Sequence, residues 1–132
     1  MVGAATLITD EKGRLLLAKR SDSRCWGFPG GGVELGEQVE MAARREAREE
    51  LGVEIGEMEL FGVFSGQELF YRYPNGDEVF VISIVYRTHE ISGDIHLNSE
   101  HLEWGWFSLH DLPEDISPPM KPVLDQFVKK YG

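Results

Sequence analysis

The sequence predicts an α/β (α+β) fold, in which two helices cover a mixed central sheet as an α/β/α sandwich. Two observations lead to that prediction. Short segments rich in β-branched and aromatic residues recur along the 132 residues, and two helical segments far apart in the chain interrupt them. The length fits one domain over residues 1–132, with no repeat, low-complexity tract or linker.

The N-terminal quarter predicts a hairpin followed by a loop. Val2–Thr9 and Arg14–Arg20 have strand composition, and Asp10–Gly13 between them carries a glycine at a turn position. Leu15–Ala18 is continuously apolar, which is typical of a strand covered on both faces. Ser21–Gly32 contains a proline and three consecutive glycines, so we expect a loop there.

The segment Glu37–Leu51 is the clearest helix in the sequence. It is rich in Ala, Glu and Arg and contains neither Gly nor Pro. It stops before Gly52, a residue that readily adopts the left-handed conformation of a helix cap. The next apolar segment, Val53–Ser65, predicts a strand.

The C-terminal half continues with strands and turns. Pro74–Asp77 predicts a turn, and Glu78–Thr88 a strand with a β-branched and aromatic centre. A loop is expected over His89–Leu102, then a short aromatic strand over Glu103–Phe107 and a helical turn over Leu109–Leu112.

The chain is expected to finish with an amphipathic helix over Lys121–Tyr131. Two prolines stand just before it, where they are compatible with a helix start. Val123, Phe127 and Val128 recur at helical spacing, so we expect them to pack inward.

The charge balance restricts the partners. Thirteen Lys and Arg stand against 23 Asp and Glu, for a net charge of −10, which argues against a nucleic-acid polymer or an anionic membrane as partner. If the substrate is a small anion, a divalent cation must lie between its negative charge and the acidic protein. The single cysteine, Cys25, precludes an internal disulfide, and no run approaches the about 20 apolar residues of a membrane span. These features predict a cytoplasmic protein.

Three glutamates of the first helix have the spacing of a metal site. Glu46, Glu49 and Glu50 are related by steps of three and four residues, so their carboxylates lie within an arc of roughly 100°. Oxygen-only ligands of this kind suit Mg²⁺ or Mn²⁺.

The alternative is that these glutamates form a solvated helix face, which is the usual place of acidic residues. The helical wheel argues against it, because Ala42 and Ala43 project into the same arc as Glu46 and Glu50. Carboxylates beside a core stripe need a compensating partner. Residue spacing alone leaves both interpretations open.

A glycine-rich segment precedes this helix. The run from Phe28 to Gly32 exposes backbone without side chains, which allows close approach to a phosphate. A tight turn would explain the same glycines. The position directly ahead of the carboxylate helix favours a phosphate-binding role, with Gly31 as a substrate contact.

Residues 31–53, GGVELGEQVEMAARREAREELGV, resemble the Nudix box. The fixed positions of that motif are all matched here; they are Gly31, Glu37, Arg45, Glu46, Glu49, Glu50 and Gly52. Ala47 is a small residue where the motif has an aliphatic one. Leu15–Arg20, Trp26–Gly32 and Trp106–Leu109 also look like landmarks of the family, so the whole chain is similar to a minimal Nudix domain.

The resemblance implies a Nudix-type sandwich that hydrolyses a nucleoside diphosphate linked to another moiety, with Mg²⁺ or Mn²⁺. It implies Glu49 and Glu50 as principal metal ligands and Glu46 as a ligand or water-orienting group. The carbonyl of Gly30 or Gly31 would complete the coordination. Arg45 would orient a carboxylate of the box or touch substrate.

The resemblance also suggests a general base. Some members use a glutamate in the loop before the late aromatic strand, and Glu100 stands six residues ahead of Trp106. Glu103 is the competing candidate. Arg20, at the end of the second strand, is a candidate phosphate contact, with a surface ion pair as the alternative.

The substrate is the least determined feature. Phe70 and Tyr71 could stack a base, although core or hairpin packing is the more usual role of such aromatic residues. Relatives acting on ADP-ribose are often longer at the N-terminus, which leads us to expect an intact or damaged nucleoside triphosphate cleaved to a monophosphate and pyrophosphate. ADP-ribose, nucleotide-sugar and dinucleoside polyphosphate hydrolases, and a non-catalytic nucleotide-binding Nudix module, stay as alternatives. Monomer and homodimer are both open.

Overall fold

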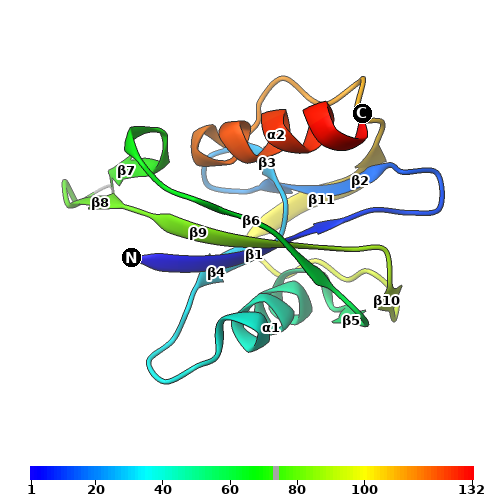
Figure 1. Ribbon diagram of the computed structural model, residues 1–132, viewed down its shortest axis with the longest axis horizontal. Helices are drawn as coiled ribbons and strands as arrows, with labels where there is room; N and C mark the ends of the chain where they lie inside the picture. Colours follow the sequence, from blue (N-terminus) through cyan, green and yellow to red (C-terminus); the bar gives the residue numbers. More distant parts are fainter. Residues whose placement is uncertain (73–74) are drawn as a thin grey trace.

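The computed structural model describes residues 1–72 and 75–132, without the side chains of Glu68 and Tyr71. Strands occupy the middle of the molecule, with α1 on one side and α2 on the other, so the expected α/β/α sandwich is confirmed (Figure 1). The helices are α1 (Val39–Leu51), α2 (Lys121–Tyr131) and the short 3₁₀ turns η1 (Gln67–Leu69) and η2 (Pro118–Met120). The strands are β1 (Val2–Ile8), β2 (Leu15–Arg20), β3 (Trp26–Gly27), β4 (Gly30–Gly32), β5 (Glu54–Ile55), β6 (Glu59–Phe64), β7 (Phe70–Arg72), β8 (Glu78–Phe80), β9 (Ile82–Thr88), β10 (Ile91–Ser92) and β11 (His101–Phe107).

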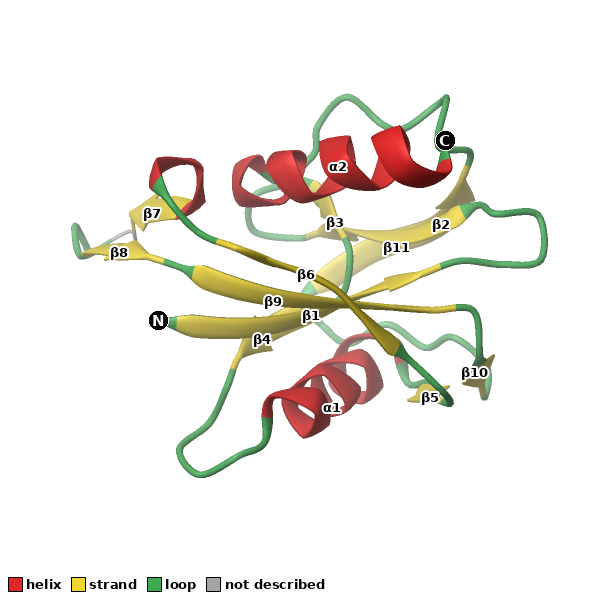
Figure 2. Cartoon of the chain, in the orientation of Figure 1, coloured by secondary structure: helices red, strands yellow, loops and turns green. Residues whose placement is uncertain are grey.

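The larger sheet is mixed, as the sequence predicts. Its strand order is β4-β1-β9-β6, and β1 runs parallel to β9 from Val2 opposite Ile82 to Ile8 opposite Thr88. Both β4 and β6 pair antiparallel with their neighbours. A second sheet, β11-β2-β3, is antiparallel throughout. α2 covers both sheets, because its buried face shares one core cluster with β1 and β9 of the first and β2 of the second (Figure 2).

The first two strands do not form the extended hairpin expected from the sequence. Gly13 does occupy the turn with a positive φ of 76°, but β1 and β2 meet only at the bridge between Thr9 and Leu15. β1 enters the larger sheet and β2 the smaller one. Both strands are buried on both faces, so each gains more from two long-range neighbours than from its partner in the turn.

The glycine-rich segment is a strand and not the predicted loop. Gly30–Gly32 pairs antiparallel with Gly3–Ala5 of β1. The glycines let the two backbones approach closely, since a Cβ on Gly30 would lie 2.6 Å from the Ala5 Cβ and 2.9 Å from the Ala4 carbonyl oxygen. This edge strand is the surface against which the acidic helix packs.

The acidic helix α1 begins two residues later than predicted, at Val39, and ends at Leu51. Gly52 has a φ of 71° and donates its N–H to the Arg48 carbonyl, so the predicted cap is confirmed. Three alanines of the helix are fully buried against the sheet. Their small side chains bring the helix close to β1 and β4.

Two predicted strands are each divided. Val53–Ser65 becomes β5 and β6, and Glu78–Thr88 becomes β8 and β9. The apolar pattern is continuous across each break, so it cannot show where pairing partners change. The loop expected before the aromatic strand contains β10, and β11 begins at His101 rather than Glu103. Beyond β11 a hydrogen-bonded turn replaces the predicted helical one, and within the predicted turn at 74–77, Pro74 lies outside the described residues.

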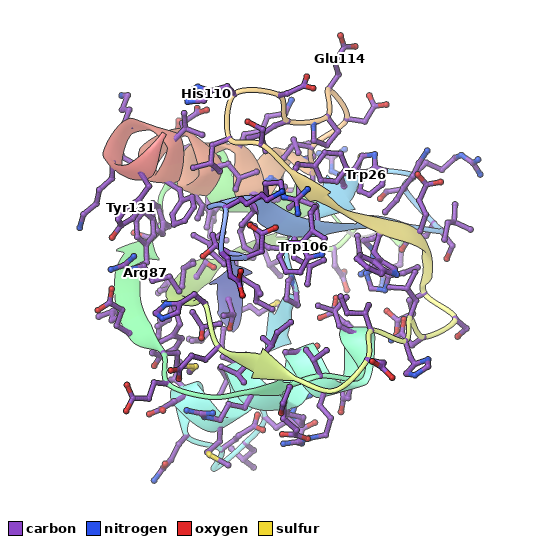
Figure 3. The ribbon with its side chains drawn as sticks, turned by 90° about the vertical axis from the view of Figure 1, so that its right-hand side faces the viewer. Trp26, Arg87, Trp106, His110, Glu114 and Tyr131 are labelled. Atoms are coloured by element: carbon purple, nitrogen blue, oxygen red, sulfur yellow. The ribbon has the colours of Figure 1, made fainter. Side chains whose placement is uncertain are left out.

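The C-terminal helix α2 has the predicted bounds. Val123 and Phe127 are buried in the core, as expected, and Val128 is half-buried. Trp26 joins the core layer beneath α2, whereas Trp106 packs into the layer beneath α1 (Figure 3). No helix within the described ranges 1–72 and 75–132 is long and apolar enough to cross a membrane.

Because β4 approaches β1 closely, alanine substitutions of Gly30 and Gly32 should have different effects on stability. Gly30→Ala should destabilise the protein by about 1–3 kcal/mol, because the new methyl group meets rigid backbone and the Ala5 side chain. Gly32→Ala is the control, since its Cβ would meet only the flexible end of Met1 at 3.3 Å. Urea unfolding of the two variants measures the difference; equal free energies of unfolding would contradict the packing described.

Candidate functional site

The carboxylates of Glu46 and Glu50 come together where α1 packs on β4. Glu50 is one of the few buried charged residues, at 7% exposure. The Glu46 side chain is 15% exposed and lies directly over Gly31, where a Cβ would come within 2.5 Å of its Oε1. The absence of a side chain at Gly31 therefore makes room for the Glu46 carboxylate.

Glu50 is held at both oxygens. The Gly30 N–H donates to its Oε2 at 2.9 Å, and the His101 Nε2 lies 3.3 Å from its Oε1. Burial raises the pKa of Glu50 to about 8, because the charged form loses its hydration. The nearby Glu46 carboxylate contributes to this rise in the pKa of Glu50, while the bond from the Gly30 N–H opposes it.

Arg45 joins the acidic residues of this region. Its guanidinium donates twice to Glu37, at 2.8 and 3.0 Å, and once to the Gly32 carbonyl at 3.0 Å. Its Nη1 is shared between Glu46 at 2.9 Å and Glu49 at 3.2 Å. The hydrogen bonds to Glu37 and Glu46 raise the pKa of Arg45, and the Arg45 contact lowers the pKa of Glu37. The structure thus shows the carboxylate-orienting contacts that were one of the two expectations for Arg45.

The three glutamates do not converge on one point as the side chains stand. Glu49 is 54% exposed and turned to Arg45, whereas Glu46 and Glu50 face each other. Among the residues that the structure describes, no group of three or more His, Cys, Asp and Glu side chains is arranged to hold a metal ion. The donor chemistry nevertheless fits a hard cation, because the buried Glu50 carboxylate faces the Glu46 carboxylate, and Arg45 contacts only the latter of the two.

The carbonyls of Gly30 and Gly31, which are the two expected near a cation, point to opposite sides of β4. Backbone groups in an antiparallel pair point alternately toward and away from the partner strand. Thr6 donates to the Pro29 carbonyl and Val33 to the Val2 carbonyl, so by this alternation Gly31 faces β1. Gly30 faces away from β1, as its bond to Glu50 shows. The Gly30 carbonyl is therefore the better placed of the two.

Arg20 and Glu100 lie next to this carboxylate pair. Arg20 lines a cavity of about 30 Å³ together with Glu50 and His101, and Cys25 contributes to the wall. The Arg20 guanidinium makes a double contact with Asp22, at 3.0 and 3.1 Å, and approaches Glu100 at 3.5 Å. The bond from Arg20 lowers the pKa of Asp22 to about 2.

Glu100 lies in the predicted loop His89–Leu102, and its backbone is anchored there. Its carbonyl accepts from the Ser21 N–H at 2.8 Å and from the Ser21 hydroxyl at 3.1 Å. Its N–H donates to Asn98 Oδ1 at 3.1 Å. The exposed carboxylate is therefore carried on a fixed backbone beside Arg20. The competing Glu103 is an exposed residue of β11.

The aromatic residues expected to stack a base are not gathered with the carboxylates. Phe70 packs on Phe80 across the β7–β8 hairpin, with ring centroids 5.4 Å apart. That hairpin lies at one end of the molecule, away from α1 (Figure 1). The side chain of Tyr71 lies outside the described residues.

Sequence reasoning missed His101 at this site. It falls within the predicted loop His89–Leu102, but in the structure it opens β11 opposite Arg20, and its side chain is only 4% exposed. Its contact with Glu50 joins residues 51 positions apart, so no local pattern reveals it. The strand register beside Arg20 is the one signal that could have indicated it.

Comparison with known proteins identifies the family to which this site belongs. The NUDIX domain model matches residues 1–127. The chain is 36% identical to an ADP-ribose pyrophosphatase of Methanocaldococcus jannaschii, over 95% of this chain and 72% of that protein. It is 34% identical to a nucleoside triphosphatase, NudI, of Escherichia coli, over 76% of this chain and 77% of that protein.

A solved structure with similar sequence has the same fold. The crystal structure of a MutT NUDIX hydrolase from Burkholderia pseudomallei superposes with a TM-score of 0.81 at 35% identity, covering 95% of both chains. Nudix hydrolases generally use divalent metal ions and bind small nucleotide substrates. With the box carboxylates in place at the α1–β4 contact, this chain belongs to the NUDIX family and is a hydrolase acting on phosphoanhydrides.

Proposed function

We propose that this chain is a Mg²⁺- or Mn²⁺-dependent pyrophosphohydrolase of an intact or damaged nucleoside triphosphate. Water adds to the α- or β-phosphorus of the triphosphate, the P–O bond to the bridging oxygen between these two phosphorus atoms breaks, and a nucleoside monophosphate and pyrophosphate result. The protein is proposed to act as a single domain on small nucleotides in the cytoplasm, with neither a nucleic-acid polymer nor a membrane as partner.

The observation that carries this proposal is the buried pair Glu46 and Glu50. Arg45 pairs with Glu46, which lies over Gly31, but Glu50 is buried beside it with its Oε2 bonded to the Gly30 N–H, and a second negative charge there is costly unless a cation neutralises it. A non-catalytic Nudix module would have no need to keep that pair. The same pair therefore supports catalysis over mere nucleotide binding.

The ligands proposed for the cation are the oxygens around this pair. Glu46 and Glu50 provide the inner carboxylates, Glu49 an outer one, and the Gly30 carbonyl a neutral oxygen. The divalent cation, when bound, screens the phosphate charge and lowers the pKa of water. Gly31 contributes by close backbone approach, and Arg45 keeps Glu46 and Glu49 in place.

Arg20 and Glu100 are proposed to act on the substrate from the other side of the cavity. The Arg20 guanidinium would hold phosphate oxygens, which suit its paired N–H groups. The Glu100 carboxylate would accept the proton of the attacking water, because it lies beside Arg20 on an anchored backbone. Phe70 and Tyr71 are retained as candidate base contacts only if the β7–β8 hairpin approaches bound substrate.

ADP-ribose is the second candidate substrate. The archaeal relative, an ADP-ribose pyrophosphatase, is similar over 95% of this chain. The nucleoside triphosphatase and the MutT hydrolase are similar at nearly the same identity. The chemistry at the carboxylates would be the same for both substrates, since each has a phosphoanhydride bond.

Glu50→Gln should lower Mg²⁺-dependent turnover by at least about a hundredfold while the fold is kept, because the amide cannot neutralise a cation. The measurement is release of pyrophosphate or phosphate from (d)NTPs and oxidised dGTP, and phosphate freed by an added phosphatase from the monoester products of ADP-ribose, nucleotide sugars and diadenosine polyphosphates. Glu40→Gln is the matched control, since Glu40 lies on the same helix, is exposed, and pairs with Arg44.

Pyrophosphate from one triphosphate, absent with Glu50→Gln and retained with Glu40→Gln, is the expected result. Turnover of ADP-ribose or a dinucleotide alone would keep the mechanism and replace the substrate. A folded Glu50→Gln protein with wild-type turnover would contradict the metal-ligand assignment. No turnover by a folded, Mg²⁺-binding wild type on the whole panel would favour the non-catalytic module.

Glu100→Gln tests the proposed base. It should lower kcat by about 10²–10⁴-fold and leave KM nearly unchanged, because the amide keeps the contact with Arg20 but cannot accept a proton. Steady-state kinetics on the substrate found above gives both constants, with Glu103→Gln as the control. An effect confined to KM, or a larger kcat loss in Glu103→Gln, would remove Glu100 from this role.

A further inference from the structure

On the side of the larger sheet that faces α1, the helix covers only half of the strands. It packs against β1 and β4, whereas β9 and β6 follow beyond it in the strand order β4-β1-β9-β6. On the opposite face, α2 covers β9 and β6 through Val85, Phe61 and Phe64. The two strands β9 and β6 are therefore packed on the α2 side, and the question is what their other face presents.

That face presents a continuous strip of apolar side chains. The strip consists of Val2, Leu60, Val63, Ile82, Ile84 and Tyr86. Tyr86 packs against the core cluster beneath α1, which identifies this face as the α1 side. In register, Val2 lies beside Ile82, Ile84 beside Val63, and Tyr86 beside Leu60. Within the described residues, Tyr86 alone of the six packs against a core cluster, and Leu60 and Val63 are 57% and 60% exposed.

The strip is uncharged, although the chain has a net charge of −10. Burial and the Glu40 carboxylate raise the pKa of Tyr86, so Glu40 lies near the strip, and it is paired with Arg44 at 3.1 Å. Two copies of this face can approach each other without placing like charges in opposition. A basic or acidic partner finds no charge in the strip to recognise.

The area of the strip fits a weak dimer. At these exposures the six side chains present on the order of 400 Å² of apolar surface, which is the size of patches that mark interaction sites. Two copies together would bury about 800 Å² of it. Since apolar atoms make up roughly 60% of an interface, the total buried area is about 1,300 Å². This value is at the lower end of the range of about 1,200–2,000 Å² for specific complexes.

The contact is expected through the face of the sheet and not through its edge. β6 is an edge strand, but its pairing with β9 shifts register between Leu60 and Gly62. An irregularity of this kind twists an edge and hinders the addition of another strand. The same shift brings Leu60 and Val63, three positions apart, onto one face and so enlarges the strip.

We propose that the apolar strip is the interface of a two-fold symmetric homodimer, in which the uncovered half-sheets of two copies pack face to face. A second copy is the occupant that the uncharged, self-complementary face and its area support. The strip contains none of the residues assigned to hydrolysis, so the dimer and the proposed function can fail independently of each other.

Val63→Lys should raise the Kd of the dimer at least about tenfold, because it places two ammonium groups in a desolvated contact. Leu102→Lys is the matched control with less than about a twofold change, since Leu102 is 49% exposed on β11 of the other sheet. Sedimentation equilibrium between about 1 µM and 1 mM gives the Kd, which is expected at about 10–100 µM for the unmodified protein. Raising NaCl from about 50 to 500 mM should tighten the dimer, because salt screens the repulsion between two acidic chains.

Three results would overturn the proposal. They are the mass of one chain up to about 1 mM, which leaves the strip to a different partner, a dimer that Leu102→Lys disrupts and Val63→Lys does not, and a dimer that salt dissociates. Methyl NMR of the unmodified protein covers the case in which Val63→Lys does not fold. Raising the concentration should shift the signals of Leu60, Val63 and Ile82 but not that of Val123, which lies in the core beneath α2. Shifts confined to other methyl groups would contradict the strip as the interface.

Discussion

The structure depends on one unfavourable contact, the burial of Glu46 and Glu50 side by side where α1 crosses β4. Burial removes hydration from the Glu50 carboxylate and, together with the neighbouring Glu46 carboxylate, raises the pKa of Glu50 to about 8. Much of the local structure limits this cost. Three glycines bring the backbone of β4 close to β1, the Gly30 N–H donates to Glu50, and the bare Cα of Gly31 accommodates Glu46. A divalent cation would complete the compensation.

Supporting contacts reach the pair from two directions. On the solvent side, Arg45 gathers Glu37, Glu46 and Glu49 around one guanidinium. On the inner side, Asn98 anchors both the His101 ring and the backbone of Glu100. A charged centre held in this way keeps its geometry without substrate, which is the condition for electrostatic stabilisation of a reacting phosphate.

Local patterns in the sequence predict the parts of this arrangement that are themselves local. The spacing of Glu46 and Glu50 places both on one helix face, and Gly52 fixes the end of that helix. Long-range pairing determines the rest. The Gly30–Gly32 strand was predicted as a loop because glycine has low strand propensity, and only the neighbouring β1 makes it a strand. His101 was missed because its contact with Glu50 depends on the packing of β11 near α1. Glu49 instead turns to Arg45, four residues earlier on the same helix, in a local ion pair that competes with convergence on the other two glutamates.

Calorimetric titration of the metal-free protein with Mg²⁺, in buffers of different ionisation enthalpy, tests this account most directly. Since the pKa of Glu50 is raised to about 8 in the folded protein, Glu50 is mostly protonated at pH 7, and cation binding must expel that proton. The account predicts release of about one proton at pH 7 and almost none at pH 9.5, above that pKa. A binding heat that does not depend on the buffer at pH 7 would contradict the claim that the cation relieves the buried carboxylate pair.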